Sequence, residues 1–179
     1  TGEIELAENN YKQAIKIKPN YAEAYYGLGL TLEKKEKFLS AIKNYEYALI
    51  NKPNYPEVFF NLGNVYRKSG DYKLAINNYK NAIELKKNYY EAYCNLGNSK
   101  KDLADVKSAK FYYKKALKIN PKDVETMWNM HGVSISIDEA IKWLSECLNA
   151  EEGCLKAKLM LSALKYLKKD KFDFNQLRK

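Results

Sequence analysis

The chain has 179 residues, of which 46% are hydrophobic and 30% charged, a composition typical of a folded protein rather than a disordered one. It contains no apolar run of about 18 residues, so no membrane-spanning segment is expected, and no charged start followed by an apolar run that would indicate a signal peptide. The net charge of +9 is spread evenly over both halves, which is typical of a solvated lysine-rich surface and also favours an acidic partner.

In chain order, the dominant feature is a set of residues that recurs every 34 positions. The repeated places hold a Leu-Gly pair, a small alanine, a tyrosine, a second alanine, and a closing proline or lysine. These residues are Leu28, Gly29, Ala41, Tyr45, Ala48 and Pro53, then Leu62, Gly63, Ala75, Tyr79, Ala82 and Lys87, then Leu96, Gly97, Ala109, Tyr113, Ala116 and Pro121. A repeat of this length predicts a solenoid of stacked helix pairs, an extended fold suited to binding rather than to chemistry.

Each unit is predicted to form two helices. In the first full unit the first helix runs to about Lys35, and the second runs from about Phe38 to Ile50. An asparagine precedes each predicted first helix, and a glutamate stands three residues after that asparagine. This spacing predicts capping boxes. These pairs are Asn20 with Glu23, Asn54 with Glu57, and Asn88 with Glu91. In the second unit, the Ser69-Gly70-Asp71 sequence predicts the turn between the two helices.

The repeated glycines and tyrosines have a predicted packing role. Glycine in each first helix lacks a side chain where the second helix must approach closely, and the repeated alanines are small for the same reason. The tyrosines are expected to fill the space between neighbouring units. Because a helix pair cannot bury its apolar face alone, each unit is expected to depend on the next.

Both ends depart from the pattern. Ala7, Tyr11, Ala14 and Pro19 match the second half of a unit without its first helix. This predicts a fragment of a longer array that self-associates through the exposed face of the N-terminal half repeat.

At the other end, His131 stands where the repeat has glycine, and Gly132 is expected to take over that role one position later. Asp138 is predicted to cap a helix from about Glu139 to Asn149, and a last helix is expected over about Cys154 to Lys169.

These residues resemble the tetratricopeptide repeat family, whose pattern is a bulky residue, Leu-Gly, an aromatic, then Ala, an aromatic, Ala and Pro. The resemblance covers three full units, with departures at Lys87 and Lys100. It implies an all-α fold, a right-handed α-solenoid of antiparallel helix pairs in a single array. The predicted division is 3–21 (half repeat), 22–55, 56–89 and 90–123 (full repeats), 124–150 (degenerate repeat) and 151–179 (C-terminal capping helix and tail).

The sequence shows no constellation for catalysis. It has one histidine, His131, and none of the nucleophile, metal, phosphate or dinucleotide motifs. Cys94, Cys147 and Cys154 are odd in number and lack C-x-x-C spacing, which predicts reduced thiols in an intracellular, cytoplasmic protein. We therefore expect this chain to have no enzyme activity, no cofactor and no metal site.

In the tetratricopeptide family the first helix of each unit lines a concave groove, so the resemblance implies a binding surface here. It places asparagines on successive first helices, and an asparagine amide can both donate to and accept from a peptide backbone. Aromatic and cationic side chains flank them as expected anchors. The peptide-binding residues expected on this basis are Tyr26, Phe60, Asn61, Asn64, Arg67, Lys68, Asn95, Asn98, Lys101, Trp128 and Asn129. The same asparagines are equally expected to bond to neighbouring helices.

Three functions remain open at this point. The first is a protein–protein interaction scaffold that binds an extended peptide segment of a partner. The second is a partner-binding arm of a larger enzyme, because the adjacent asparagines also resemble the superhelical arm of O-linked N-acetylglucosamine transferases. The third, which the sequence favours least, is a groove for single-stranded nucleic acid built on Tyr and Lys.

Overall fold

The computed structural model describes the backbone of residues 2–176 and the side chains of residues 2–169. This part of the chain is all helical and contains no strand. The helices are α1 (Gly2–Ile17), α2 (Ala22–Lys34), α3 (Phe38–Asn51), α4 (Pro56–Lys68), α5 (Tyr72–Leu85), α6 (Tyr90–Asp102), α7 (Val106–Ile119), α8 (Val124–Gly132), α9 (Ile137–Ala150) and α10 (Leu155–Gln176). The predicted all-α solenoid is confirmed, and the predicted first and second helices agree with α2 and α3 to within a residue.

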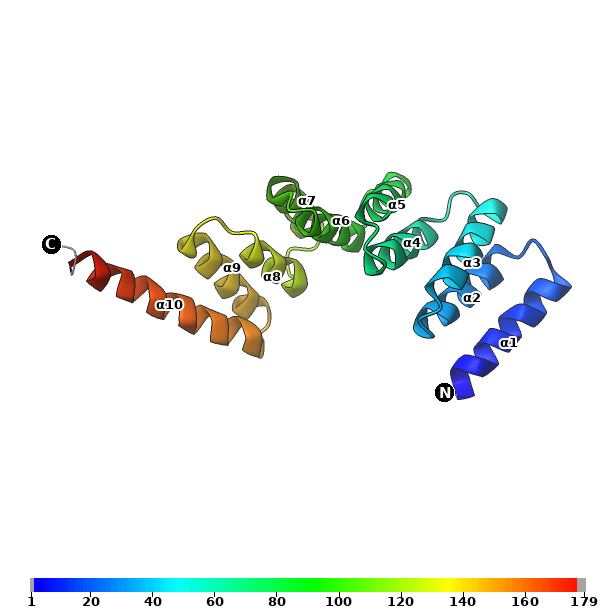
Figure 1. Ribbon diagram of the computed structural model, residues 1–179, viewed down its shortest axis with the longest axis horizontal. Helices are drawn as coiled ribbons and strands as arrows, with labels where there is room; N and C mark the ends of the chain where they lie inside the picture. The colour runs from blue at the N-terminus through cyan, green and yellow to red at the C-terminus, as the bar shows by residue number, and fades with distance from the viewer. Residues whose placement is uncertain (1, 177–179) are drawn as a thin grey trace.

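The helices form an elongated arch with α1 at one end and α10 at the other (Figure 1). From α2 to α9, each even-numbered helix packs most extensively on the odd-numbered helix that follows it, and less extensively on the helix before it. The even-numbered helices α4, α6 and α8 lie toward the inner side of the arch, and α5, α7 and α9 lie toward its outer side (Figure 1). One side of these even-numbered helices therefore contributes to a common inner surface.

The glycine of each Leu-Gly pair permits the close approach of the two helices of a unit. A Cβ built on Gly29, Gly63 or Gly97 would lie 2.4–2.5 Å from a ring carbon of the tyrosine of the same unit. Those tyrosines, Tyr45, Tyr79 and Tyr113, are each 0% exposed. The predicted packing role of the glycines is confirmed.

The prediction for the degenerate unit is wrong. A Cβ on Gly132 would meet nothing within 4 Å, so this glycine does not take over the close helix contact. It is the last residue of the short helix α8. The His131 ring instead lies against Trp128, with centroids 5.1 Å apart. Helix α8 is shorter than α2, α4 and α6, and it packs less extensively on α9 than they do on the helices that follow them.

The predicted capping boxes are also wrong. The residues that precede α2, α4 and α6 as N-caps are Tyr21, Tyr55 and Tyr89, and none forms a side-chain cap hydrogen bond. The helices start one residue later than the boxes require, so the glutamates occupy the second helical position. There two of them meet a lysine that directly follows the second helix of the same unit: Lys52 Nζ lies 3.0 Å from Glu23 Oε1, and Lys86 Nζ lies 3.9 Å from Glu57 Oε1.

The same lysines cover the N-cap tyrosines. Lys52 Nζ lies 4.2 Å from the Tyr55 ring centroid, and Lys86 Nζ lies 4.3 Å from that of Tyr89. A lysine that contacts both a carboxylate and an aromatic face links one unit to the next. Asn120 stands where the third unit needs this lysine, so the linkage is absent there.

The turns within units share one backbone geometry. Gly70 lies in the predicted Ser69-Gly70-Asp71 turn with φ of 81°, and Asp71 caps α5 by accepting a hydrogen bond from the Leu74 amide. Glu36 and Ala104 hold the equivalent places in the neighbouring units with φ of 57° and 59°. A left-handed backbone suits glycine and costs other residues free energy. Two of the three turns are therefore strained.

The C-terminal predictions need two corrections. Ser136, not Asp138, caps α9, because the Ser136 hydroxyl accepts from the Glu139 amide and the helix starts at Ile137. Helix α10 starts at Leu155 and continues past Lys169 to Gln176. Residues 177–179 of the predicted tail lie outside the described residues.

Candidate functional site

The inner surface carries a chain of hydrogen-bonded asparagine amides, which we call the asparagine ladder (Asn61, Asn64, Asn95 and Asn98). Asn61 Nδ2 donates to the Tyr26 hydroxyl at 2.9 Å, which joins α4 to α2. Asn95 Nδ2 donates to Asn64 Oδ1 at 2.8 Å, which joins α6 to α4. Within each helix the bond is longer, 3.4 Å from Asn64 Nδ2 to Asn61 Oδ1. The ladder therefore crosses unit boundaries.

Buried tyrosines anchor one asparagine in each unit of the ladder. The Tyr79 hydroxyl donates to Asn64 Oδ1 at 2.8 Å, and the Tyr113 hydroxyl donates to Asn98 Oδ1 at 2.7 Å. Burial raises the pKa of both tyrosines well above the ordinary value, so the hydroxyls remain donors. Asn98 itself is 6% exposed. Asn64 and Asn98 therefore orient the other two asparagines and connect the groove to the core.

Asn61 and Asn95 are half-buried and retain hydrogen-bonding capacity. Among the described residues, each donates one hydrogen bond and accepts one from the asparagine three residues later. A primary amide can donate two and accept two. Each therefore has one N–H and one oxygen lone pair that these bonds do not use, the pair of groups that a peptide unit needs.

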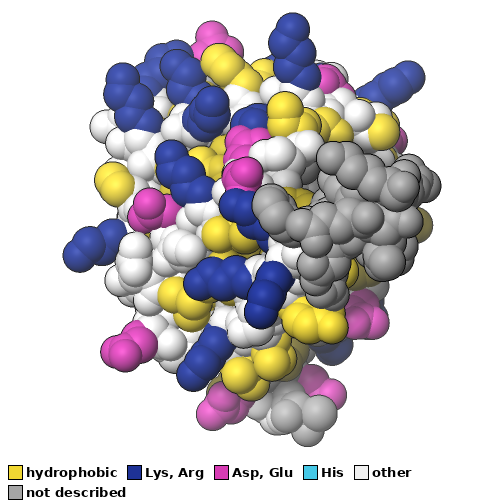
Figure 2. Space-filling view, turned by 90° about the vertical axis from the view of Figure 1, so that its left-hand side faces the viewer, with side chains coloured by type: hydrophobic (Ala, Val, Ile, Leu, Met, Phe, Trp, Pro, Cys, Tyr) yellow, Lys and Arg dark blue, Asp and Glu magenta, His cyan; other side chains and the backbone are white. Residues whose placement is uncertain are grey.

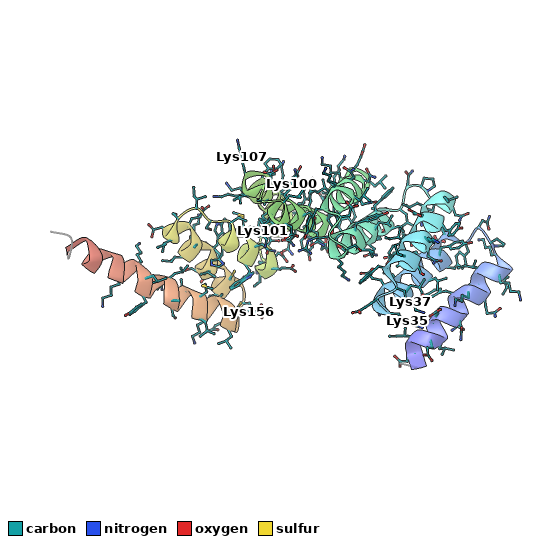
Figure 3. The ribbon with its side chains drawn as sticks, in the orientation of Figure 1. Lys35, Lys37, Lys100, Lys101, Lys107 and Lys156 are labelled. Carbon is teal, nitrogen blue, oxygen red and sulfur yellow. The ribbon has the colours of Figure 1, made fainter. Side chains whose placement is uncertain are left out.

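Asn129 does not continue the ladder. It is 9% exposed, its Nδ2 points at Cys94 Sγ at 3.7 Å, and its Oδ1 accepts from Lys101 Nζ at 3.5 Å. Lys101 is labelled in Figure 3 and lies where α6 meets α8. Cys94 stands where the preceding units have an aromatic residue. Because its side chain is smaller, the Asn129 amide can turn inward toward it.

The predicted aromatic anchors are packed between units. Tyr26 lies 5.1 Å from Tyr55, and Phe60 lies 5.0 Å from Tyr89, measured between ring centroids. Both are half-buried, as is Trp128. The Tyr26 hydroxyl meets the asparagine ladder at Asn61, while the rings of Tyr26 and Phe60 pack against the tyrosine that precedes the next inner helix.

The predicted cationic anchors are paired across units. Arg67 Nε lies 3.0 Å from Asp102 Oδ2, and Lys68 Nζ lies 2.7 Å from Glu33 Oε1. Glu33 also accepts from the Tyr45 hydroxyl at 2.9 Å. This tyrosine has no asparagine to bond to, because Leu30 occupies that place in the first unit.

The sequence analysis missed Glu33 and Asp102 as partners of these cations. The signal that could have found them is a pair of opposite charges separated by one repeat plus one residue, which places them on adjacent inner helices.

The lysine excess is distributed over the surface. On the face seen in Figure 2, Lys and Arg side chains lie among hydrophobic and neutral ones rather than in one continuous tract. None of the described helices is both long and apolar enough to pass through a membrane. Within the described residues, no group of three or more His, Cys, Asp and Glu side chains is arranged to hold a metal ion.

The stacked helix pairs and the shared inner surface define a helical-repeat solenoid, a class of protein–protein interaction scaffold. Comparison with known families is more specific. One family model described as tetratricopeptide repeat matches residues 22–55 and 90–123, and a second with the same description matches residues 44–77. A third model, described as TPR repeat, matches residues 1–36 and 63–103. Together these matches span residues 1–123 without a gap. The chain belongs to the tetratricopeptide repeat family.

Solved structures have the same fold. A crystal structure of MamA protein is 25% identical with a TM-score of 0.75, and the match covers 87% of this chain and 86% of that one. A structure described as a MamA RS-1 ArsTM double mutant has a TM-score of 0.79 at 18% identity, over 87% and 89% of the two chains. YrrB, described as a TPR protein with an unusual peptide-binding site, has a TM-score of 0.73 at 23% identity, over 89% and 84%. No curated protein matches the sequence.

Proposed function

We propose that the chain is a scaffold that holds an extended peptide segment of a partner protein in its concave groove. The observation that carries this proposal is the state of Asn61 and Asn95. Each is oriented by hydrogen bonds to its neighbours, and each retains a donor and an acceptor that these bonds do not use. Groups held in place before binding lose little conformational entropy when a ligand arrives.

The surroundings support a peptide as the occupant. The exposed edges of Tyr26 and Phe60 offer apolar contact beside the amides, and the paired charges of Arg67 and Asp102 offer both signs at the groove edge. An asparagine amide that bonds to the backbone of a peptide can do so whatever the side chains of that peptide are. The residues that flank the asparagines therefore set the preference for a peptide sequence. Lys68, Lys101 and Trp128 complete the proposed surface.

The test begins with a peptide selected from a random dodecapeptide library displayed on phage, which is then titrated against purified chain. Asn95→Ala is expected to weaken its binding by about 2- to 13-fold, the equivalent of one hydrogen bond of about 0.5–1.5 kcal/mol. The matched control is Asn78→Ala, because the Asn78 amide donates to the Leu74 carbonyl of its own helix on α5. The proposal is wrong if Asn78→Ala weakens binding while Asn95→Ala leaves it unchanged.

A further inference from the structure

A second hollow lies away from the asparagine ladder, between α5 and α7 with α6 as its floor. Two adjoining cavities, each of about 430 Å³, share Lys87, Tyr93 and Lys115 in their walls. Lys80 extends the hollow along α5, and Lys118 extends it along α7. We call this surface the α5–α7 cleft.

The cleft holds four lysines and one acid. Lys80, Lys87, Lys115 and Lys118 take part in none of the ion pairs found among the described side chains. Glu84 is the single carboxylate in its wall. Ammonium groups gathered in one hollow repel each other, and an anionic ligand would relieve that repulsion. The cleft therefore has a net positive charge without an internal partner.

The repeat contains a natural control for this charge. One unit earlier, between α3 and α5, a cavity of about 220 Å³ occupies the equivalent place. There Pro53 stands in place of Lys87, Asn81 in place of Lys115, and Glu84 in place of Lys118. The fold thus forms this hollow with or without the lysines, so packing does not require the positive charge.

The walls of the cleft are also apolar. Tyr93 and Leu96 line its floor, and Phe111 and Tyr112 line its α7 side, where the preceding unit has Asn77 and Asn78. Phe111 is 55% exposed, and Lys115 Nζ lies 5.5 Å from its ring centroid. Cationic heads above an apolar surface fit a ligand that carries acidic groups beside a hydrophobic one.

The cleft and the asparagine ladder lie on opposite sides of α6. Tyr93 and Asn95 are two residues apart, which turns their side chains about 200° from each other around the helix. Figure 1 shows α5 and α7 on the outer side of the arch. A ligand in the cleft would therefore leave the inner groove free.

We propose that the α5–α7 cleft binds an acidic peptide segment of a partner protein, with its carboxylates on Lys87, Lys115 and Lys118 and an apolar side chain against Tyr93 and Phe111. A nucleic acid strand fits less well, because its regular phosphates need cations that continue over several units. Here the positive charge stops at the unit boundary, where Asn81 and Glu84 occupy the equivalent places.

The probe is a fluorescein-labelled dodecapeptide of Asp and Glu residues around a central Phe-Leu pair, titrated by anisotropy at 0.15 M salt. The variant carries Lys115→Asn with Lys118→Glu, which copies the residues of the preceding unit. The matched control carries Lys43→Asn with Lys16→Glu, which changes the net charge equally at exposed lysines of α3 and α1. Circular dichroism and the melting temperature check that both variants fold.

The cleft variant is expected to lose about tenfold in affinity, and the control less than about twofold. An equal loss in both variants overturns the proposal in favour of non-specific charge attraction. Displacement of the probe by oligothymidylate at the same charge concentration overturns it in favour of nucleic acid. The Asn95→Ala variant is expected to bind this probe as tightly as the unmodified chain does. If Asn95→Ala weakened binding of the probe, the probe would lie in the concave groove and the proposal would be overturned.

Discussion

The contact between Gly63 and Tyr79 offers a direct measure of how tightly a unit is packed. A Cβ on Gly63 would lie 2.5, 2.7 and 2.9 Å from Cε1, Cδ1 and Cζ of Tyr79, whereas ordinary contact begins at 3.4 Å. Because the Tyr79 ring is fully buried, it cannot move aside into solvent. Gly63→Ala must therefore separate α4 from α5, or displace the ring, by about 1 Å.

Two effects of opposite sign set the magnitude for Gly63→Ala. Overpacking a tight core contact costs about 1–3 kcal/mol. Alanine in place of a helical glycine contributes about 1 kcal/mol in the other direction. The displacement also strains the bond from the Tyr79 hydroxyl to Asn64, which adds to the cost. The expected net loss of stability is about 1–2 kcal/mol, a fall in melting temperature of about 2–8 °C for a chain of this size.

The assay is thermal unfolding followed by circular dichroism, with Gly132→Ala as the control. Gly132 is also helical, but a Cβ there meets nothing within 4 Å, so its substitution is expected to be neutral or stabilising. A double variant that combines Gly63→Ala with Tyr79→Leu tests whether the clash with the Tyr79 ring causes the loss of stability. Because leucine is smaller than tyrosine, Gly63→Ala should cost less stability in the Tyr79→Leu background than in the unmodified chain. A Gly63→Ala melting temperature equal to or above that of the unmodified chain would refute the reasoning.

Three further predictions follow from single contacts. Ala104→Gly should raise stability by about 1 kcal/mol, because glycine relieves the φ of 59°, and the melting temperature checks this. Hydrogen bonds from Lys12 and Lys35 lower the Glu8 pKa from 4.5 to about 2, so its stabilisation is complete above pH 4.5 and is lost as pH falls toward 2. Glu8→Gln should remove that part of the acid dependence in denaturant titrations at several pH values. Tyr113→Phe should cost about 1–3 kcal/mol by leaving a buried amide oxygen unpaired, measured by urea unfolding.

The sequence was sufficient for several features that lie within one unit. The Gly63 contact, the turn at Gly70 and the limits of α3 all follow from local pattern and helix geometry. Two of the features that failed depend on where a helix begins: α2 starts one residue later than its capping box requires, and Ser136 rather than Asp138 caps α9. Glu23 was assigned to a capping box at the start of α2, but it pairs with Lys52, which follows α3 in the same unit.

The candidate site also combines features that were expected from the sequence with features that were not. Asparagines were expected on successive first helices because they recur at the repeat period, whereas the pairing of Arg67 with Asp102 was not expected, because it depends on the offset between α4 and α6. Asn129 has the right position in sequence and lies buried, because Cys94 in the neighbouring helix leaves room for its amide. Lys87 was visible as a departure from the pattern. Its proximity to Lys115 and Lys118 required the structure.

The proposed groove makes a last prediction, about the length of its ligand. Asn61 and Asn95 lie on neighbouring inner helices, and packed helices are about 8–10 Å apart. An extended chain advances about 3.3–3.6 Å per residue, so the two asparagines reach peptide units about three residues apart.

The selected dodecapeptide is therefore expected to respond to backbone N-methylation in a pattern. Methylation at the two contacted amides, three residues apart, should weaken binding more than methylation at the amides between them, because N-methylation removes the donor that an asparagine oxygen accepts. Truncation to fewer than about four residues should abolish binding by leaving one asparagine without a partner. Titration of a complete N-methyl series measures both effects. Equal sensitivity at every position would show that side chains, and not the asparagine ladder, hold the peptide, since only the ladder imposes a spacing set by the distance between helices.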